Sequence, residues 1–256
     1  GEYQYHDPYS SDPPEPADLT DVYYHPVYAK GCTNSRFEGF IIVDSPWWHF
    51  ETFNCSETIF RNLKELSWNV TTDGIWIGSS CTVSDNFFCI NDDIICFRVG
   101  EDNIVENNVH WNQKAGSVYT FGTGYDGNCS NMEIRNEYII REEAAWNSDK
   151  AVIYQWQFGG EQLVEHITFK NIKLEEINRF MNIQTDPNYY NAWSDVRFEN
   201  IIFESLPSTA SYLKGTSYTN SIENPVFRNI YVDTEPVNDF AEINMETAFL
   251  INPVFE

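Results

Sequence analysis

A three-residue phrase recurs along this chain and limits its fold more strongly than any other feature. The phrase is a large apolar residue, then any residue, then Asn, Asp or Gly. It occurs eight times, as Phe37-Glu38-Gly39, Phe60-Arg61-Asn62, Val83-Ser84-Asp85, Val105-Glu106-Asn107, Ile134-Arg135-Asn136, Phe169-Lys170-Asn171, Phe198-Glu199-Asn200 and Phe227-Arg228-Asn229. Successive third positions are 23, 23, 22, 29, 35, 29 and 29 residues apart. A repeat of this period is typical of a solenoid, in which each repeat forms one coil.

The chemistry of the phrase predicts the type of solenoid. Its apolar residue points inward from a short strand, its second residue points outward, and its third tolerates the left-handed backbone of a tight turn. One coil cannot bury its apolar side alone, so the coils must stack with parallel strands about 4.8 Å apart. The Leu-x-x-Leu-x-Leu phrase of leucine-rich repeats is absent. We predict an all-β fold, a single-stranded right-handed parallel β-helix of about eight coils.

Two departures from the repeat define the predicted domain limits. Residues 1–30 contain Asp-Pro, Pro-Pro and Glu-Pro steps and many tyrosines without an apolar period, which predicts an irregular N-terminal arm. Residues 31–256 are expected to form the β-helix. Residues 252–256 repeat the pattern of residues 224–228, so we expect a helix that is truncated in its C-terminal coil.

The charge of the chain excludes several classes of partner. Its 39 acidic and 15 basic residues give a net charge of −24, which repels nucleic acid and anionic membranes. The same charge disfavours a polyanionic substrate such as pectin, although it could equally serve only to keep the protein in solution. No apolar run approaches the roughly 18 residues that a membrane-spanning helix needs, so no membrane insertion is expected.

Six cysteines and three glycosylation sequons together indicate a eukaryotic secretory protein, and we predict an extracellular location. The predicted glycosylation sites are Asn54, Asn69 and Asn128. Cys32 and Cys55 each lie five residues before the apolar residue of a phrase. They therefore share one position on adjacent coils, and we predict a disulfide between them. The pairing of the remaining cysteines stays open: Cys81, Cys89, Cys96 and Cys129.

Three carboxylates form the candidate catalytic cluster. Asp73 follows one coil, and Asp92 and Asp93 come nineteen and twenty residues later, at the corresponding part of the next coil. If they converge, repulsion and partial burial raise at least one pKa, which produces a general acid beside a general base. Glycoside hydrolysis uses such a pair, and a separation of about 6.5 to 9.5 Å predicts inversion. Taken alone, Asp73 or Asp93 fits an ordinary turn residue better than a catalyst, whereas the acids together, at this spacing on neighbouring coils, favour catalysis.

Other side chains near these acids are candidate substrate contacts. Trp76, Trp111, Tyr154 and Trp156 could stack on sugar rings, and Lys114 follows on the next coil. Packing in the core or in turns is the alternative for each aromatic residue. The five histidines show no metal-binding spacing and no phosphate-binding loop is present, so we expect neither a metal nor a cofactor.

At these motifs the sequence resembles the pectin-lyase-like β-helix glycosidases. It is most similar to glycoside hydrolase family 49, the dextranases and isopullulanases, and more distantly to the family 28 polygalacturonases. The resemblance covers about residues 40 to 160. Its motifs are Thr72-Asp73-Gly74, Ile90-Asn91-Asp92-Asp93-Ile94-Ile95-Cys96, Val109-His110-Trp111 and Phe121-Gly122.

The resemblance implies roles for the three acids. Asp92 would be the general acid, while Asp73 and Asp93 position and deprotonate the attacking water. Family 28 also uses a Gly-His-Gly turn and an Arg-x-Lys pair to bind galacturonate, whereas this chain has Lys114-Ala115-Gly116 at the corresponding coil. This difference favours a neutral glycan. Cys96 stands where family 49 usually has Lys.

Two functions follow as hypotheses. The first is a secreted, inverting glycoside hydrolase that acts on a neutral polysaccharide. The second is a catalytically silent module that binds carbohydrate or builds an extracellular coat or filament, with homo- or hetero-assembly through the edge of the solenoid. The partner in the first case is a polysaccharide or other glycan.

Overall fold

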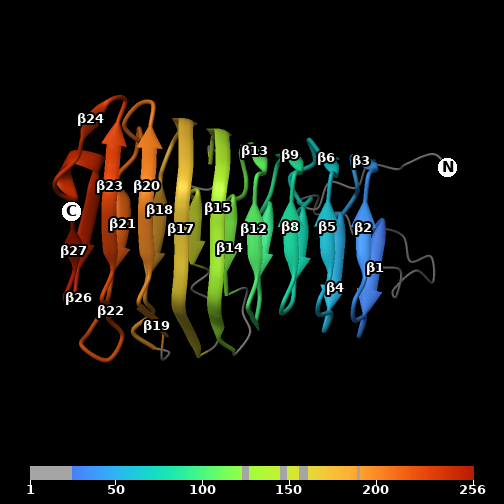
Figure 1. Cartoon of the computed structure of the whole chain (residues 1–256), viewed down its shortest axis with the longest axis horizontal. Helices are drawn as coiled ribbons and strands as arrows, with labels where there is room; N and C mark the ends of the chain where they lie inside the picture. The colour runs from blue at the N-terminus through green and yellow to red at the C-terminus, as the bar shows by residue number, and fades with distance from the viewer. Residues whose placement is uncertain (1–24, 123–126, 145–148, 156–160, 189–190) are drawn as a thin grey trace, which may run out of the picture.

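The structure is a computed structural model that describes residues 25–122, 127–144, 149–155, 161–188 and 191–256. These residues form a right-handed parallel β-helix, which confirms the predicted fold class. Its coils stack side by side from the N-terminal to the C-terminal end (Figure 1). In this part of the chain the helical element is a single turn of 3-10 helix, η1 (Ala241–Ile243), and no helix could cross a membrane.

Each coil contributes one strand to a sheet that we call sheet A. Within the described residues sheet A has nine parallel strands that pair in chain order. They are β1 (Val27–Lys30), β4 (Phe50–Phe53), β7 (Ile75–Ile77), β10 (Ile95–Phe97), β14 (Tyr119–Phe121), β16 (Ile153–Gln155), β18 (Met181–Gln184), β21 (Ser211–Lys214) and β25 (Met245–Ala248).

The rest of each coil contributes to a second sheet, which we call sheet B. In the early coils two short strands flank the third residue of the phrase, and in later coils they merge into one longer strand. The strands are β2 (Arg36–Glu38), β3 (Ile41–Val43), β5 (Ile59–Arg61), β6 (Lys64–Leu66), β8 (Thr82–Ser84), β9 (Phe87–Ile90), β11 (Gly100–Glu101), β12 (Ile104–Glu106), β13 (Val109–Asn112), β15 (Cys129–Glu142), β17 (Gln162–Ile177), β19 (Asn191–Ser194), β20 (Arg197–Phe203), β22 (Ile222–Glu223), β23 (Val226–Val232), β24 (Glu235–Pro236), β26 (Leu250–Ile251) and β27 (Val254–Phe255).

The recurring phrase has the backbone conformation that its chemistry predicted. All eight third positions have a positive φ, from 52° at Asn62 to 77° at Gly39. The apolar residues of the phrase pair in register on neighbouring coils, so Phe60 lies beside Val83 and Phe169 beside Phe198. The left-handed residue therefore turns the chain at the same point in every coil.

Stacked side chains hold the coils together inside and outside. In the core the ring centroids of Phe198 and Phe227 are 4.5 Å apart and stacked. On the outer surface the amide of Asn200 donates to the Oδ1 atom of Asn171 at 2.8 Å, and Asn229 donates in turn to Asn200 at 3.0 Å. These bonds run along the stacking direction, so each coil stabilises the next.

The first coil begins earlier than the sequence predicted. Strand β1 pairs in parallel with β4, so residues 27–30 belong to the helix and not to the predicted arm, and the boundary at residue 31 is corrected. The helix starts earlier because Val27 and the residues after it alternate between half-buried and exposed against β4.

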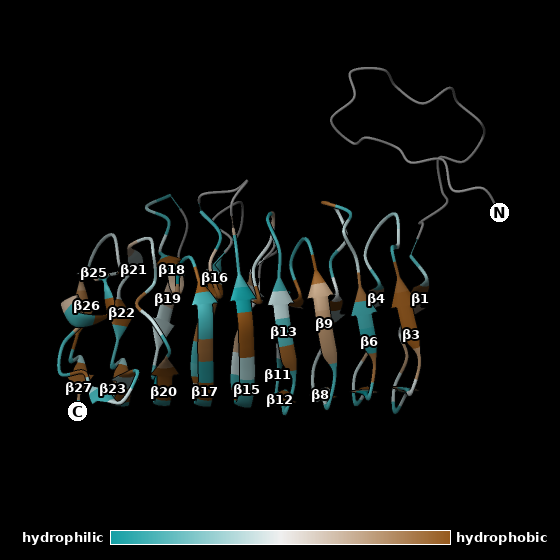
Figure 2. Cartoon of the chain, turned by 90° about the horizontal axis from the view of Figure 1, so that it is seen from above, coloured by the Kyte–Doolittle hydropathy of each residue, from teal (hydrophilic) through white to brown (hydrophobic). Residues whose placement is uncertain are grey.

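The first coil also exposes apolar side chains. Ile41 and Val43 are 60% and 54% exposed on β3, which is brown in Figure 2.

Candidate active site

The three predicted acids lie at the turn that precedes sheet A. Asp73 comes before β7 and Asp93 before β10, and Ile75 pairs with Ile95 in register. Asp73 and Asp93 are therefore stacked on adjacent coils, and the backbone N–H of Gly74 donates to the carbonyl oxygen of Asp93 at 2.8 Å. Asp73 and Asp93 are buried, and Asp92 is partly exposed. The stacking of coils thus brings together carboxylates that are twenty positions apart.

Gly116 from the following coil closes against this turn. A Cβ atom at Gly116 would lie 1.9 Å from the carbonyl carbon of Asp92 and 2.3 Å from the backbone nitrogen of Asp93. Only glycine permits this approach, because any side chain would push the peptide between the two aspartates away. The side-chain amide of Asn112 also donates to the carbonyl oxygen of Asp92 at 2.7 Å. The backbone that carries both acids is therefore held from two directions.

Asp93 forms a buried ion pair that the sequence did not predict. Lys150 Nζ donates to Oδ1 and Oδ2 of Asp93 at 2.8 and 2.9 Å, and both side chains are almost fully buried. The backbone N–H of Ser117 donates to Oδ1 at 2.8 Å. Burial opposes the charged form of Lys150, but Asp93 and Asp92 outweigh it and raise the pKa of this lysine. No motif marked Lys150, since its partner is 57 positions away.

Asp73 is bound by an indole from β7, the strand that follows it. Trp76 Nε1 donates to Oδ2 of Asp73 at 2.7 Å, and the Cys96 thiol lies 3.9 Å from the same oxygen. Burial, followed by the charges of Asp92 and Asp93, raises the pKa of Asp73 well above its usual value, although the bond from Trp76 opposes this shift. Burial likewise raises the pKa of Cys96, so its thiol stays protonated.

Asp92 is the most accessible of the three acids. Its Oδ1 accepts the backbone N–H of Asp93 at 3.0 Å. Burial and then the charge of Asp93 raise the pKa of Asp92 to about 7, and Lys150 limits the rise. The raised pKa values let Asp73 and Asp92 hold their protons to higher pH than ordinary aspartates, next to Asp93, which is paired with Lys150. This combination can supply both an acid and a base.

Trp76 does not offer a face for sugar stacking. One side of its ring stacks on Trp48, with centroids 4.1 Å apart, and the Arg98 guanidinium lies 4.6 Å from its centroid. The residue is 9% exposed. Trp76 therefore does not make the predicted stacking contact with a sugar. It contacts the candidate site through the hydrogen bond from its N–H group to Asp73.

The other predicted substrate contacts occupy different surroundings. Tyr154 lies on β16 under Lys150, whose Nζ is 4.6 Å from its ring centroid, and burial raises its pKa. Trp111 lies on β13 in sheet B and is 37% exposed. Lys114 is exposed in the turn beside Asn91, which accepts its backbone N–H at 3.0 Å. Trp156 lies outside the described residues.

The predicted modification sites are at or near the surface. Asn54 and Asn128 are exposed, while Asn69 is half-buried and its amide lies 3.4 Å from the carbonyl oxygens of Ser45 and Pro46. The backbone N–H of Cys32 donates to the sulfur of Cys55 at 3.4 Å. Cys32 and Cys55 are free thiols in this structure, and the disulfide between them stays a prediction. The same part of the chain contains no group of three or more potential metal ligands.

Comparisons with known proteins match this architecture. The family model for glycosyl hydrolases family 28 matches residues 20–236. Dextranases from Arthrobacter sp. (strain CB-8) and Arthrobacter globiformis are 24% and 26% identical over 154 residues, which are 52% of this chain and 24% of each dextranase. A probable polygalacturonase from Arabidopsis thaliana is 26% identical over 223 residues, 81% of this chain and 48% of that protein. The matches thus span about a quarter of each dextranase and half of the polygalacturonase.

Proposed function

The chain belongs to glycosyl hydrolases family 28, and from this premise we propose that it cleaves glycosidic bonds in a polysaccharide with Asp73, Asp92 and Asp93. The predicted resemblance to β-helix glycosidases is confirmed at the level of the family. One observation carries the proposal for the site: the three carboxylates converge, and the pKa values of Asp73 and Asp92 are raised.

Asp92 is the general acid in this proposal. Its pKa of about 7 keeps it largely protonated in mildly acidic solution, and it is the acid that is most open to substrate. It gives its proton to the glycosidic oxygen while the bond from that oxygen to the anomeric carbon breaks. The leaving sugar then departs as a neutral alcohol.

Asp93 is the general base, and Asp73 helps to position the water. The water oxygen bonds to the anomeric carbon while one of its protons passes to Asp93. Lys150 balances the negative charge of Asp93 before this step and fixes the orientation of its carboxylate. Trp76 orients Asp73 in the same way through its N–H group.

We propose inversion at the anomeric carbon. Asp73 meets Asp92 and Asp93 from the neighbouring coil, and we propose that a water held by Asp73 and Asp93 attacks the anomeric carbon from the side opposite the general acid Asp92. Proton NMR of the first product from dextran tests this: α-linked substrate should give β-anomer before mutarotation. A first product with the α-configuration would contradict the proposed water attack.

We propose a neutral polysaccharide as the substrate. The net charge of −24 repels a polyanion, and two relatives carry the name dextranase. The test is the release of reducing ends from dextran, pullulan and polygalacturonic acid, with Asp92→Asn as the inactive variant. Asp85→Asn is the matched control, since Asp85 holds a turn position that is Asn in most other coils. Equal release by the wild type and Asp92→Asn on every substrate would refute hydrolysis at this site.

Burial of the acids favours a second candidate function. Asp73 and Asp93 are only 5% and 3% exposed, and both oxygens of Asp93 are bound by Lys150. A catalytically silent module that binds carbohydrate, or that assembles through the edge of the solenoid, is consistent with this burial. Binding of dextran oligosaccharides in isothermal titration calorimetry, without any release of reducing ends, would favour a carbohydrate-binding function. Concentration-dependent association in analytical ultracentrifugation would favour assembly.

We propose that the protein is secreted and N-glycosylated. The exposed side chains of Asn54 and Asn128 support this, because an acceptor asparagine must be accessible. Expression in eukaryotic cells, followed by peptide N-glycosidase treatment, should lower the apparent mass of the secreted protein. Protein that remains inside the cells, with no change in mass, would contradict both parts of the proposal.

A further inference from the structure

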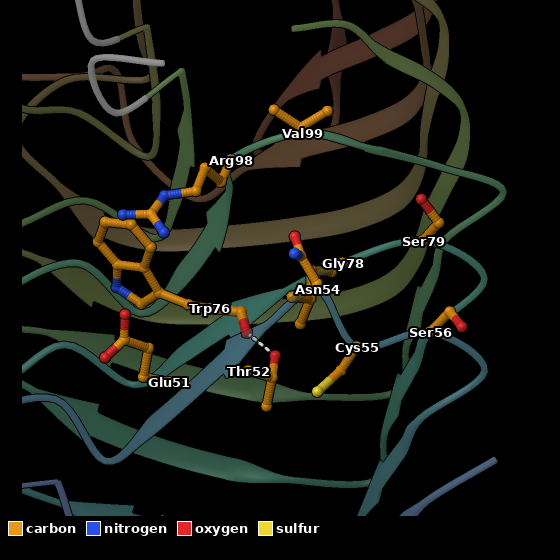
Figure 3. Close-up of a pocket in the computed structure, with 11 residues that line it drawn as sticks. Glu51, Thr52, Asn54, Cys55, Ser56, Trp76, Gly78, Ser79, Arg98 and Val99 are labelled. Atoms are coloured by element: carbon orange, nitrogen blue, oxygen red, sulfur yellow. Dashed lines mark hydrogen bonds between the residues drawn. The ribbon is translucent and has the colours of Figure 1, made fainter. Parts of the chain in front are cut away.

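A pocket of about 490 Å³ lies next to Trp76 (Figure 3). Three successive coils line the pocket. They contribute residues of β4 and β7 and the residues that follow β4, β7 and β10. Trp76, Arg98 and Glu51 gather at one end, and Ser56 and Ser79 lie toward the other (Figure 3). The pocket is distinct from the turn that carries the three acids, because it lies toward the opposite ends of the same strands.

The lining combines opposite charges with hydroxyl groups. Arg98 supplies N–H donors and Glu51 supplies carboxylate acceptors, so the charges in the pocket balance. Ser56 and Ser79 can both donate and accept. Sugar hydroxyls also do both, and a neutral ring can meet all of these groups without placing an anion beside Glu51. The volume is sufficient for at least one hexose ring.

Trp76 connects this pocket to the proposed chemistry. Its ring and Arg98 form one end of the pocket, and its N–H group donates to Asp73 at 2.7 Å. Its backbone carbonyl oxygen is bonded by the hydroxyl of Thr52, which also lines the pocket (Figure 3). A ligand that contacts Arg98 and Trp76 is therefore linked to the acid cluster through a single residue, Trp76.

We propose that this pocket binds a neutral sugar ring that does not itself react, one or more units away from the bond that is cleaved. This inference rests on the proposed glycosidase function and extends it by assigning a second contact region for the glycan chain. Binding energy gained there can align the reacting bond with Asp92 and Asp93, which lowers the barrier for long substrates more than for short ones.

The ring could come from two sources. One is the substrate chain, and the other is an N-glycan of the protein itself, since Asn54 also lines the pocket and begins a sequon. The shared chemistry is a neutral sugar ring among Arg98, Glu51 and the two serines. Deglycosylated wild type and Asn54→Gln distinguish the two sources. Neither protein carries a glycan at Asn54, so any sugar bound in their pocket must come from the substrate.

The test uses isomalto-oligosaccharides of two to eight glucose units and measures kcat/KM for each length. Ser79→Trp fills the pocket and Arg98→Gln removes its guanidinium, while Arg61→Gln is the control for loss of an exposed arginine on β5. We expect kcat/KM of the wild type to rise with length. The loss in both pocket variants should grow with length and reach at least tenfold for the longest substrate, with Arg61→Gln at wild-type values.

A loss that is equal at all lengths, or no loss, would overturn the inference while leaving hydrolysis intact. If the wild type releases no reducing ends, the proposed hydrolysis is refuted. The pocket is then tested by oligosaccharide binding alone. Titration of Trp fluorescence with the eight-unit oligosaccharide should then give a Kd at least tenfold higher for Ser79→Trp than for the wild type. A lower Kd in Asn54→Gln than in the glycosylated wild type would identify the protein's own glycan as a competing occupant, and unchanged Kd values in all variants would reject the site.

Discussion

Lys150 donates to both carboxylate oxygens of Asp93, across 57 positions of sequence and from a neighbouring region of the stacked coils. Both side chains are almost completely shielded from water. In that environment each charge depends on the other, because an isolated buried ion would lose its hydration without compensation. The ion pair therefore orients the proposed base and also couples the site to the stability of the fold.

Replacing Lys150 by Met should destabilise the protein strongly. The change leaves Asp93 buried without its partner, which costs about 3 to 5 kcal/mol in the free energy of unfolding. Urea denaturation monitored by circular dichroism measures this loss. Lys214→Met is the matched control, since Lys214 and Glu246 form a more exposed pair, and it should cost less than about 1 kcal/mol. Equal losses for the two variants would show that the buried pair does not stabilise the fold.

Stability should fall as pH rises from about 4 to about 7. The pKa of Asp92 is raised from 3.8 to about 7 by burial and by Asp93, and that of Asp73 is also raised, so the folded state binds more protons than the unfolded state in this window. The stabilisation is complete below the unfolded pKa and is lost as pH passes the folded pKa. Asp92→Asn should flatten the curve by an amount on the order of 2 kcal/mol, reduced by the partial exposure of the side chain.

Urea titrations at half-unit pH steps measure this effect, and Asp85→Asn is the control for the loss of an exposed aspartate. In the active protein the same group predicts a decline in kcat above about pH 7, where the general acid loses its proton. A stability that rises between pH 4 and 7 would contradict the raised pKa values.

Trp76→Phe should change the chemistry more than the fold. The phenyl ring can still stack between Trp48 and Arg98, but the N–H bond to Asp73 is lost. Because that bond lowers the pKa of Asp73, its removal should raise this pKa further and shift the pH profile of kcat upward, with kcat about tenfold lower. The pH–rate profile is the readout. Trp193→Phe also loses a buried indole bond, to Gln155 on β16, and should lower stability without shifting the profile.

Gly116→Ala should remove activity even where the protein still folds. Its Cβ would lie 1.9 Å from a backbone atom of Asp92, so the peptide that joins the two acids must move. A displacement of about 1 Å costs on the order of a hundredfold in kcat. Gly31→Ala is the control: Gly31 has a φ of 64° but no atom within 4 Å of the new Cβ, so it should lose stability and keep activity. Full activity of Gly116→Ala would refute the close approach.

Local patterns were enough to predict the coils. The phrase marks the inward residue and the left-handed residue of each coil, as Phe60 and Asn62 show. Parallel register follows from this because the same position recurs in every coil, so Phe169 meets Phe198 without further information. The start of the first coil was missed because residues 27–30 lack a phrase and are recognised only by their pairing with β4.

The site was only partly predictable for a related reason. Asp73 and Asp93 carry turn motifs at a coil spacing, so sequence identified them as candidates. Lys150 lies in a segment with no motif, and its role exists only through a partner from another coil. Trp76 was recognised as a nearby aromatic residue. Its ring faces, however, are covered by Trp48 and Arg98, and this packing directs its N–H group to Asp73.

By itself the sequence determined a stack of parallel coils and the positions at which three carboxylates could meet, since both follow from a short pattern repeated at the length of one coil. Only the tertiary structure decided which carboxylate is paired with a lysine and which have raised pKa values. Those properties depend on burial and on charges that approach from other coils, and their energies become large only where water is excluded.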